Sequence, residues 1–220
     1  MPAVVSSLNV AAPRRIPVYE ELTGIDKRPV DGPVSVRAPG SPKGGSGLVG
    51  DAVCDELHHG GDSQAVYAYA REDLDWWEKE LGASFSSGSF GENLTTSGID
   101  ITAALIGERW RVGDELVLQV TDPRIPCRTF ALWLQRNGWV ETFTAHGAPG
   151  TYFAVIEPGE VRRGDPITVL SKPEHDVSIG VAFRAKTTEP ELFGRVLTAG
   201  EHLSPQLRET AIRRARNRTA

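Results

Sequence analysis

Alternating apolar and polar positions recur through most of the chain. Leu116, Leu118 and Val120 occupy every second position, the spacing that puts side chains on one face of a strand. Short runs rich in β-branched residues and bounded by glycine or proline predict further strands. Those strands are expected over residues 4–10, 34–36, 52–57, 141–145, 151–157 and 166–170.

Two segments with helical spacing interrupt this strand pattern. Leu74, Trp77 and Leu81 recur three and four residues apart before a glycine, which predicts a helix that ends there. A second helix is expected to begin just after Cys127 and to end at the Asn-Gly pair 137–138. Many short strands with only two helices among them predict a mainly β (α+β) fold, built as a β-barrel-like domain.

The pattern becomes helical after residue 172. Three helices are predicted, over 176–186, 190–199 and 204–218. Prolines at 190 and 205 suit the first turns of the last two helices. We therefore predict two parts, a β-rich domain over 1–172 and a three-helix segment over 173–220.

Charge and cysteine content exclude several classes of protein. The 24 basic and 29 acidic residues give a formal charge of −5, which argues against binding to nucleic acid polymers or to anionic membranes. The two cysteines form no CxxC pair, so neither a disulfide framework nor a zinc ribbon is indicated. The first ten residues do not resemble a signal peptide, and no apolar run is long enough to span a membrane. We expect a cytoplasmic protein with no membrane partner.

Cys127 is the strongest candidate for chemistry. Prolines at 123 and 126 restrict the backbone that leads to it, and the predicted helix follows directly. A helix N-terminus and the charges of Arg124 and Arg128 favour a thiolate, which can bind a metal or attack an electrophile. The alternative is that Cys127 is a small buried apolar residue. Cys54 lies within a predicted strand and is expected to be structural.

Other polar segments are weaker signals. Lys27 lies in a loop stiffened by proline, where it could hold a phosphate, although solvated surface charge explains such residues more often. His59 precedes two glycines that would let the backbone approach a ligand. Residues 89–100 group hydrogen-bonding side chains, including Asn93 and Thr95, in a composition that also suits ordinary turns.

Four segments taken together resemble a known family. They are DKRPVDGPV (26–34), HHGGDSQAVYAY (58–69), GSFGENLTTSGI (88–99) and TDPRIPC (121–127). Their order and spacing are similar to those of the MOSC family, the domain named after the C-terminal part of molybdenum cofactor sulfurase. The chain most resembles the stand-alone bacterial MOSC proteins linked to detoxification of N-hydroxylated base analogues such as 6-N-hydroxylaminopurine. The helical tail is similar to the three-helix segment of that subgroup.

The resemblance implies a pocket for a molybdenum-pterin cofactor (Mo-molybdopterin), with Cys127 as the protein ligand to the metal. It also implies the residues that would line the pocket for the pterin and its phosphate: Lys27, His59, Asn93, Thr95 and Arg124. We expect an oxidoreductase that reduces a small N-hydroxylated substrate by cleaving its N–O bond, with Cys127 and His59 as catalytic residues and His59 as the proton donor. We find no flavin, haem or iron–sulfur signature, so the electrons would come from a separate reductase.

Two alternatives use the same residues. The first is a carrier that binds the molybdenum cofactor, or transfers sulfur, without turnover. The second is a metal-free cysteine enzyme in which Cys127 is the nucleophile and His59 or His146 is the base. The helical tail could pack on the β domain, dock a reductase or form an oligomer.

Overall fold

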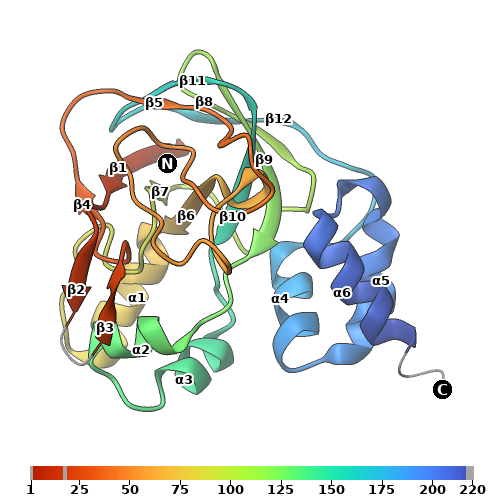
Figure 1. The fold of residues 1–220 in the computed structure, drawn as a ribbon. Helices are drawn as coiled ribbons and strands as arrows, with labels where there is room; N and C mark the ends of the chain where they lie inside the picture. Colours follow the sequence, from red (N-terminus) through yellow and green to blue (C-terminus); the bar gives the residue numbers. More distant parts are fainter. Residues whose placement is uncertain (1, 17–18, 217–220) are drawn as a thin grey trace.

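An eight-stranded sheet forms the centre of the molecule in a computed structural model that describes residues 2–16 and 19–216 (Figure 1). Its strands, in spatial order, are β12 (Ile167–Ser171), β8 (Arg109–Val112), β9 (Leu116–Pro123), β10 (Thr151–Glu157), β6 (Val66–Ala70), β7 (Leu94–Ser97), β1 (Val4–Val10) and β4 (Arg28–Pro29). All neighbours pair antiparallel except β6 and β7, which run parallel. The mainly β (α+β) prediction is confirmed.

The sheet does not close into a barrel, so the barrel-like prediction is wrong in this respect. β12 approaches the start of β1 at one isolated bridge, between Val4 and Pro166. A closed barrel needs a continuous ladder between its edge strands, whereas here the contact is a short group of backbone hydrogen bonds around the bridge, such as Ile167 N–H to the Ala3 carbonyl at 2.8 Å and Val5 N–H to the Asp165 carbonyl at 2.9 Å. Beyond this point β1 pairs with β7 on one side and with the very short β4 on the other. Two small pairs lie outside the main sheet: β2 (Arg14–Ile16) with β3 (Tyr19–Thr23), and β5 (Val34–Val36) with β11 (Gly159–Val161).

Three helices within the β-rich part are joined by an aromatic core. They are α1 (Arg71–Leu81), α2 (Arg128–Leu134) and α3 (Trp139–His146), and Figure 1 shows α2 and α3 side by side. Between them and β6 lie buried rings, among them Tyr69, Phe90 and Trp77. The Trp77 Nε1–H donates a hydrogen bond to the Tyr69 hydroxyl at 3.0 Å, so the buried indole leaves no polar group unpaired.

Two local predictions are wrong. Residues 52–57 form a loop and not a strand. Residues 141–145 lie inside α3, because Trp139 and Phe143 are one helical turn apart and are both buried in the aromatic core. The short β-branched run there is compatible with a strand, but a helix forms because it buries both aromatic side chains on one face.

The three C-terminal helical segments are confirmed, although the second is broken into short turns. α4 (Ile179–Thr187) is followed by a 3-10 turn (Pro190–Leu192), by α5 (Phe193–Val196) and by a second 3-10 turn (Leu197–His202), and α6 (Pro205–Arg216) ends the described chain. Gly200 has φ 57°, a left-handed conformation that interrupts the helical path. Residues 217 and 218 of the predicted third helix lie outside the described residues.

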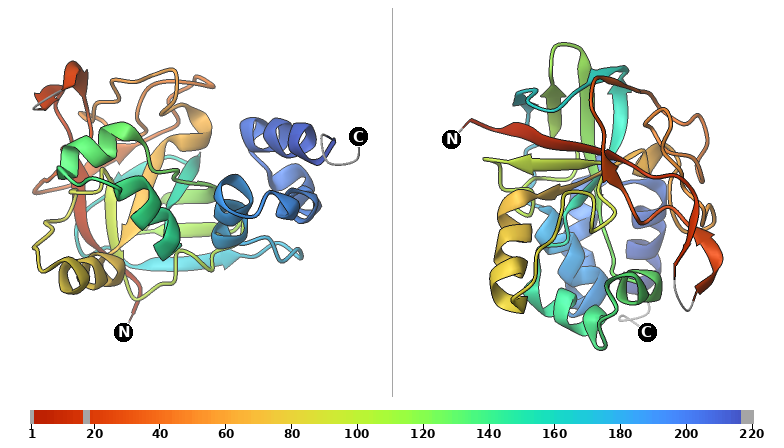
Figure 2. Two further views of the ribbon diagram at one scale, coloured as in Figure 1. Left: turned by 90° about the horizontal axis from the view of Figure 1, so that it is seen from below. Right: turned by 90° about the vertical axis from the view of Figure 1, so that its left-hand side faces the viewer.

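The C-terminal helices share a hydrophobic core with the sheet. Ala182 of α4, Phe193 of α5 and Leu207 of α6 belong to the same buried cluster as Val120 of β9. In Figure 2 (left) the blue C-terminal helices stand to one side of the strands. The domain boundary at residue 172 therefore stays a prediction, because the apolar packing is continuous across it. No helix of the described chain is long and apolar enough to cross a membrane.

The adjacent tryptophans of α1 test the aromatic core. Trp77 is 0% exposed, whereas Trp76 is 42% exposed and stacks on His146. We expect Trp77→Ala to lower the free energy of unfolding by about 3–5 kcal/mol, because it leaves a large cavity. Trp76→Ala is the matched control and should cost about 1 kcal/mol, the worth of one partly exposed aromatic stack. Urea denaturation of both variants measures this, and equal losses would contradict the assignment of the core.

Candidate functional site

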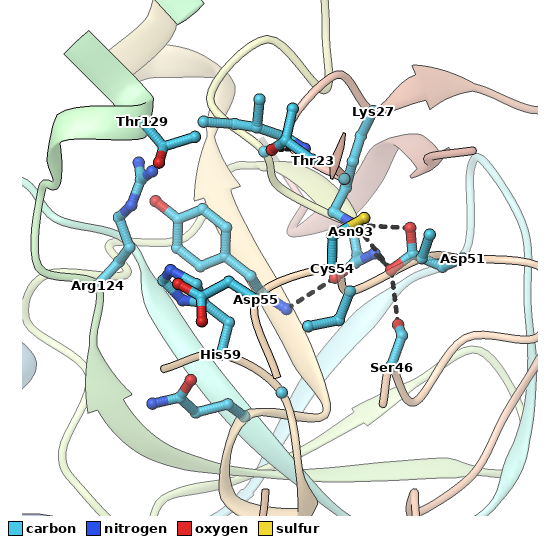
Figure 3. Close-up of a pocket in the computed structure, with 18 of the residues that line it drawn as sticks. Thr23, Lys27, Ser46, Asp51, Cys54, Asp55, His59, Asn93, Arg124 and Thr129 are labelled. Atoms are coloured by element: carbon cyan, nitrogen blue, oxygen red, sulfur yellow. Dashed lines mark hydrogen bonds and ion pairs between the residues drawn. The ribbon is translucent and has the colours of Figure 1, made fainter. Parts of the chain in front are cut away.

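A pocket of about 780 Å³, including the space at its open mouth, lies where loops from distant parts of the chain meet (Figure 3). Its walls come from residues 22–27, 46–55, 59–67, 90–93, 124–129 and from Tyr152. The structure thus brings five of the six candidate residues to one cavity: Lys27, His59, Asn93, Arg124 and Cys127. Thr95, the sixth candidate, does not line it.

Cys127 caps the N-terminus of α2, as its position before a helical run predicted. Its backbone is extended, with φ −132° and ψ 171°, and the helix begins at the next residue. Burial, the largest influence, raises the pKa of the thiol, but a hydrogen bond from His59, the charge of Arg124 and the Phe130 backbone N–H lower it. The net result is a pKa of about 7. A substantial fraction of Cys127 is therefore thiolate at neutral pH.

Arg124 supplies an unbalanced positive charge at this end of the pocket. The residue is 5% exposed, and its guanidinium lies 3.7 Å from the centre of the Phe130 ring and donates to the Phe90 carbonyl at 3.3 Å. Within residues 2–16 and 19–216, no ion pair involves Arg124. A buried guanidinium with free donors is suited to bind an anionic group of a ligand.

Asp51 is the centre of a hydrogen-bond network at the opposite end of the pocket, although no motif in the sequence indicated it. Its carboxylate is 1% exposed and accepts hydrogen bonds from Lys27 Nζ at 2.5 and 2.7 Å. It also accepts from Ser46 Oγ at 2.6 Å and Asn93 Nδ2 at 2.9 Å (Figure 3). A further hydrogen bond comes from the Ala11 backbone N–H at 2.8 Å. Burial lowers the pKa of Lys27, and the Asp51 carboxylate opposes that shift. The charge of Lys27 is thus already matched, which makes Arg124 the stronger candidate to hold a phosphate.

His59 is placed by a close approach between two loops. Gly60 and Gly61, which follow it, have φ 77° and 84° and pack against residues 42–45. A Cβ on Gly61 would lie 2.6 Å from the Pro42 carbonyl oxygen, so only glycine fits. These contacts hold the loop at the pocket wall, where His59 reaches Cys127 and Asp55 lies beside it (Figure 3).

Cys54 also lines the pocket, in the loop where a strand was expected. It lies near Asp51 (Figure 3). Burial raises the pKa of its thiol, the charge of Lys27 lowers it, and the Asp51 carboxylate adds to the rise. The two cysteines thus share a cavity with opposite electrostatics, and Cys127 is the one inclined to ionise.

Thr95 lies behind the pocket wall. It is fully buried and donates to Glu92 Oε1 at 2.8 Å. The Glu92 carboxylate also accepts from the backbone N–H groups of Gly88 and Phe90, at 2.6 and 3.0 Å. Thr95 and Glu92 therefore shape the turn that presents Phe90 and Asn93 to the cavity.

The sequence did not indicate that two tyrosines line the pocket. It also did not show where His146, the alternative base for Cys127, lies. Tyr67 and Tyr152 line the pocket with rings 5.0 Å apart, but each lies in a strand whose apolar pattern indicates only core. His146 stacks on Trp76 with ring centres 3.8 Å apart and does not line the pocket. The structure therefore leaves His59 as the histidine beside Cys127.

Comparison with known proteins identifies the family. The MOSC domain family model matches residues 55–168, more than half of the chain. YflK of Bacillus subtilis is 34% identical over 82% of this chain and 79% of its own length. The chain belongs to the MOSC domain family. The crystal structure of YiiM from Geobacillus stearothermophilus superposes on this MOSC domain protein with a TM-score of 0.78 and 28% identity, covering 97% of this chain and 99% of that one.

In one longer relative, the region similar to this chain is a minor part of the protein. A protein named "Reductase" from Gibberella moniliformis is 28% identical over 70% of the MOSC domain protein, a region that makes up 27% of that relative.

The reactivity of Cys127 gives a direct test of the site. In cofactor-free MOSC domain protein, we expect the rate of Cys127 alkylation to reach half its maximum near pH 7 and to fall at lower pH as the thiolate is protonated. His59→Ala should move this midpoint upward, because burial then meets less opposition. Mass spectrometry of the two cysteine peptides measures the profiles, and Cys54, whose pKa is raised, serves as the internal control. Coincident profiles for the two thiols would contradict this electrostatic picture.

The Asp51–Lys27 pair gives a second test. Asp51→Ala would leave Lys27 buried without its partner, so we expect a loss of about 3–5 kcal/mol in the free energy of unfolding. Asp55→Ala is the control, because Asp55 is 47% exposed and pairs with an exposed histidine, which is worth about 1 kcal/mol or less. Chemical denaturation compares the two variants. A loss for Asp51→Ala no larger than for the control would show that the pair does not hold the pocket together.

Proposed function

We propose that this MOSC domain protein binds a molybdenum-pterin cofactor in the pocket and reduces N-hydroxylated bases or related N-hydroxylated compounds. The observation that carries the proposal is the pairing, on one wall, of a cysteine with a pKa of about 7 and a buried arginine without a carboxylate partner. The first suits a soft metal ligand and the second suits an anionic phosphate. Membership of the MOSC family supports the same cofactor.

The donor set fits the cofactor. Among the described residues, no cluster of three or more His, Cys, Asp or Glu could hold a metal ion. A single cysteine would be sufficient for a metal whose other ligands come from the pterin dithiolene, and the position of Cys127 in the pocket and its pKa of about 7 support that role. Arg124 would hold the phosphate, and Asn93 lines the same cavity at its Asp51 end.

The proposed reaction is a two-electron reduction in which R–NHOH, two electrons and two protons give R–NH₂ and water. The bound cofactor supplies the redox chemistry. His59 lies at the pocket wall beside Cys127, where it would donate a proton to the oxygen that leaves as water. The rings of Tyr67, Phe90 and the partly buried Tyr152 would limit the access of bulk water and offer apolar surface to a flat base.

The electrons would come from a separate reductase. We find no flavin, haem or iron–sulfur signature in the chain. The Gibberella relative named "Reductase" supports this division, because the region similar to this chain makes up a minor part of it. An oxidoreductase built from a substrate domain and a separate electron source fits both observations.

The hydrogen bond between His59 and Cys127 favours a second candidate, a metal-free cysteine enzyme in which His59 activates the thiol. A cofactor carrier or sulfur-transfer protein without turnover would use the same pocket. The three functions differ in whether the protein holds molybdenum and whether the loaded protein turns over substrate.

Metal content is the first measurement. Protein made in a host that synthesises the cofactor should hold molybdenum and pterin near one equivalent, and Cys127→Ser should lose most of the metal because a hydroxyl is a poor soft ligand. The loaded protein is then given 6-N-hydroxylaminopurine and a chemical electron donor. His59→Ala should retain the metal and lose about 10²-fold in turnover.

Each outcome selects one function. Metal with turnover supports the reductase, and metal without turnover with any of several N-hydroxylated substrates leaves the carrier. Wild-type protein that repeatedly holds neither molybdenum nor pterin overturns the proposal and favours the metal-free cysteine enzyme.

A further inference from the structure

Side chains of the C-terminal helical segment donate hydrogen bonds to one buried carboxylate of the sheet. Asp122 of β9 is 3% exposed. Its Oδ1 lies 3.1 Å from Nζ of Lys186, in the last turn of α4, and its Oδ2 accepts from Ser204 Oγ at 2.5 Å. Ser204 precedes α6 and also accepts from the Leu207 backbone N–H at 3.1 Å. Two elements of the helical segment thus converge on one side chain.

Asp122 is near the end of β9, just before the segment that carries the pocket residues. The ladder between β9 and β10 includes Asp122 with Tyr152 and ends at Pro123. Residues 124–127 belong to no helix or strand. The backbone that bears Arg124 and Cys127 is therefore held by the end of β9 on one side and by α2 on the other.

Apolar packing alone would not need this arrangement. A buried ion pair contributes little net stability, because desolvation offsets most of its attraction. Its directional hydrogen bonds do fix position, since Lys186 and Ser204 satisfy different oxygens of one carboxylate. Removing either partner leaves the buried carboxylate only partly satisfied, which allows the strand end to shift.

We propose that Asp122 is a positioning residue through which the C-terminal helices hold the end of β9 and so place Arg124 and Cys127 in the pocket. The helical segment is then part of the site. This inference deepens the proposed function and rests on it only for the role of the pocket, since the contacts themselves do not depend on any ligand.

The experiment measures Cys127 alkylation by iodoacetamide at pH 7 in the cofactor-free full chain, followed by mass spectrometry of the Cys127 peptide. Lys186→Met and Ser204→Ala should each slow the reaction about fivefold, because a shift of the end of β9 moves Cys127 away from the side chains of Arg124 and His59 that promote its reactivity. Ser204→Ala changes no charge. If both variants slow the reaction equally, the cause is therefore the position of residues 124–127 and not the loss of the Lys186 charge. Lys186→Arg and Ser204→Thr keep the charge and the hydroxyl, and they should restore most of the rate.

Arg184→Met is the matched control. Arg184 lies in the same helix and pairs with Glu189 at 3.1 Å, so this variant loses an ion pair of the helical segment without touching β9. It should react at the wild-type rate. Thermal denaturation of all variants checks that each remains folded at the assay temperature.

Wild-type alkylation rates in Lys186→Met and Ser204→Ala would overturn the proposal. It would also be overturned if the conservative variants were as slow as the disruptive ones, or if Arg184→Met slowed the reaction equally, because a general loss of stability would then explain the result. The readout needs no metal, so failure of the proposed reductase function would leave this test intact.

Discussion

The buried carboxylate of Asp51 is the interaction on which the pocket depends. It joins Ala11 at the end of β1, Lys27 from the loop before β4, Ser46 from the glycine-rich loop and Asn93 at the start of β7. These segments are far apart in the chain, and although β1 pairs with both β4 and β7, Lys27 and Ser46 lie in loops outside those ladders. A charge that is 1% exposed needs all these donors, and each donor brings its own loop to the same point.

The two ends of the pocket differ in charge, and this difference defines what it can hold. At one end the Lys27 ammonium and the Asp51 carboxylate neutralise each other. At the other, Arg124 carries a charge that no ion pair within residues 2–16 and 19–216 balances, next to a thiol whose pKa is about 7. A ligand that combines an anionic group with a soft electrophilic centre is complementary to the second end. His59 lies beside this end, where a proton can be held or delivered.

Local signals in the sequence were reliable where the chain determines its own conformation. The start of the helix after Cys127, the helix that ends before Gly82 and the strand over Leu116–Pro123 follow from spacing and from glycine or proline, and the structure confirms them. The helix after Cys127 ends at Leu134, earlier than the Asn-Gly pair 137–138 predicted, because Gln135 adopts a left-handed conformation with φ 53°. The wrong secondary-structure predictions arose where burial in the core determined which of two locally possible conformations formed. Residues 141–145 are helical because Trp139 and Phe143 both enter the aromatic core. The sheet remains open because its edge strands are β12 and β4, and β12 approaches β1 by a short contact around the Val4–Pro166 bridge that does not extend into a ladder.

The sequence by itself determined which residue types were available and which local geometry they favoured, including a cysteine before a helix between two arginines. Only the tertiary structure decided which of these residues contact one another. No motif marks Asp51 in the sequence, yet its carboxylate accepts a hydrogen bond from the Lys27 ammonium. Likewise, Asp122 accepts hydrogen bonds from Lys186 and Ser204 across the interface with the C-terminal helices. The physical reason is that charge balance and desolvation depend on contacts between distant segments, and these contacts exist only once the core has formed.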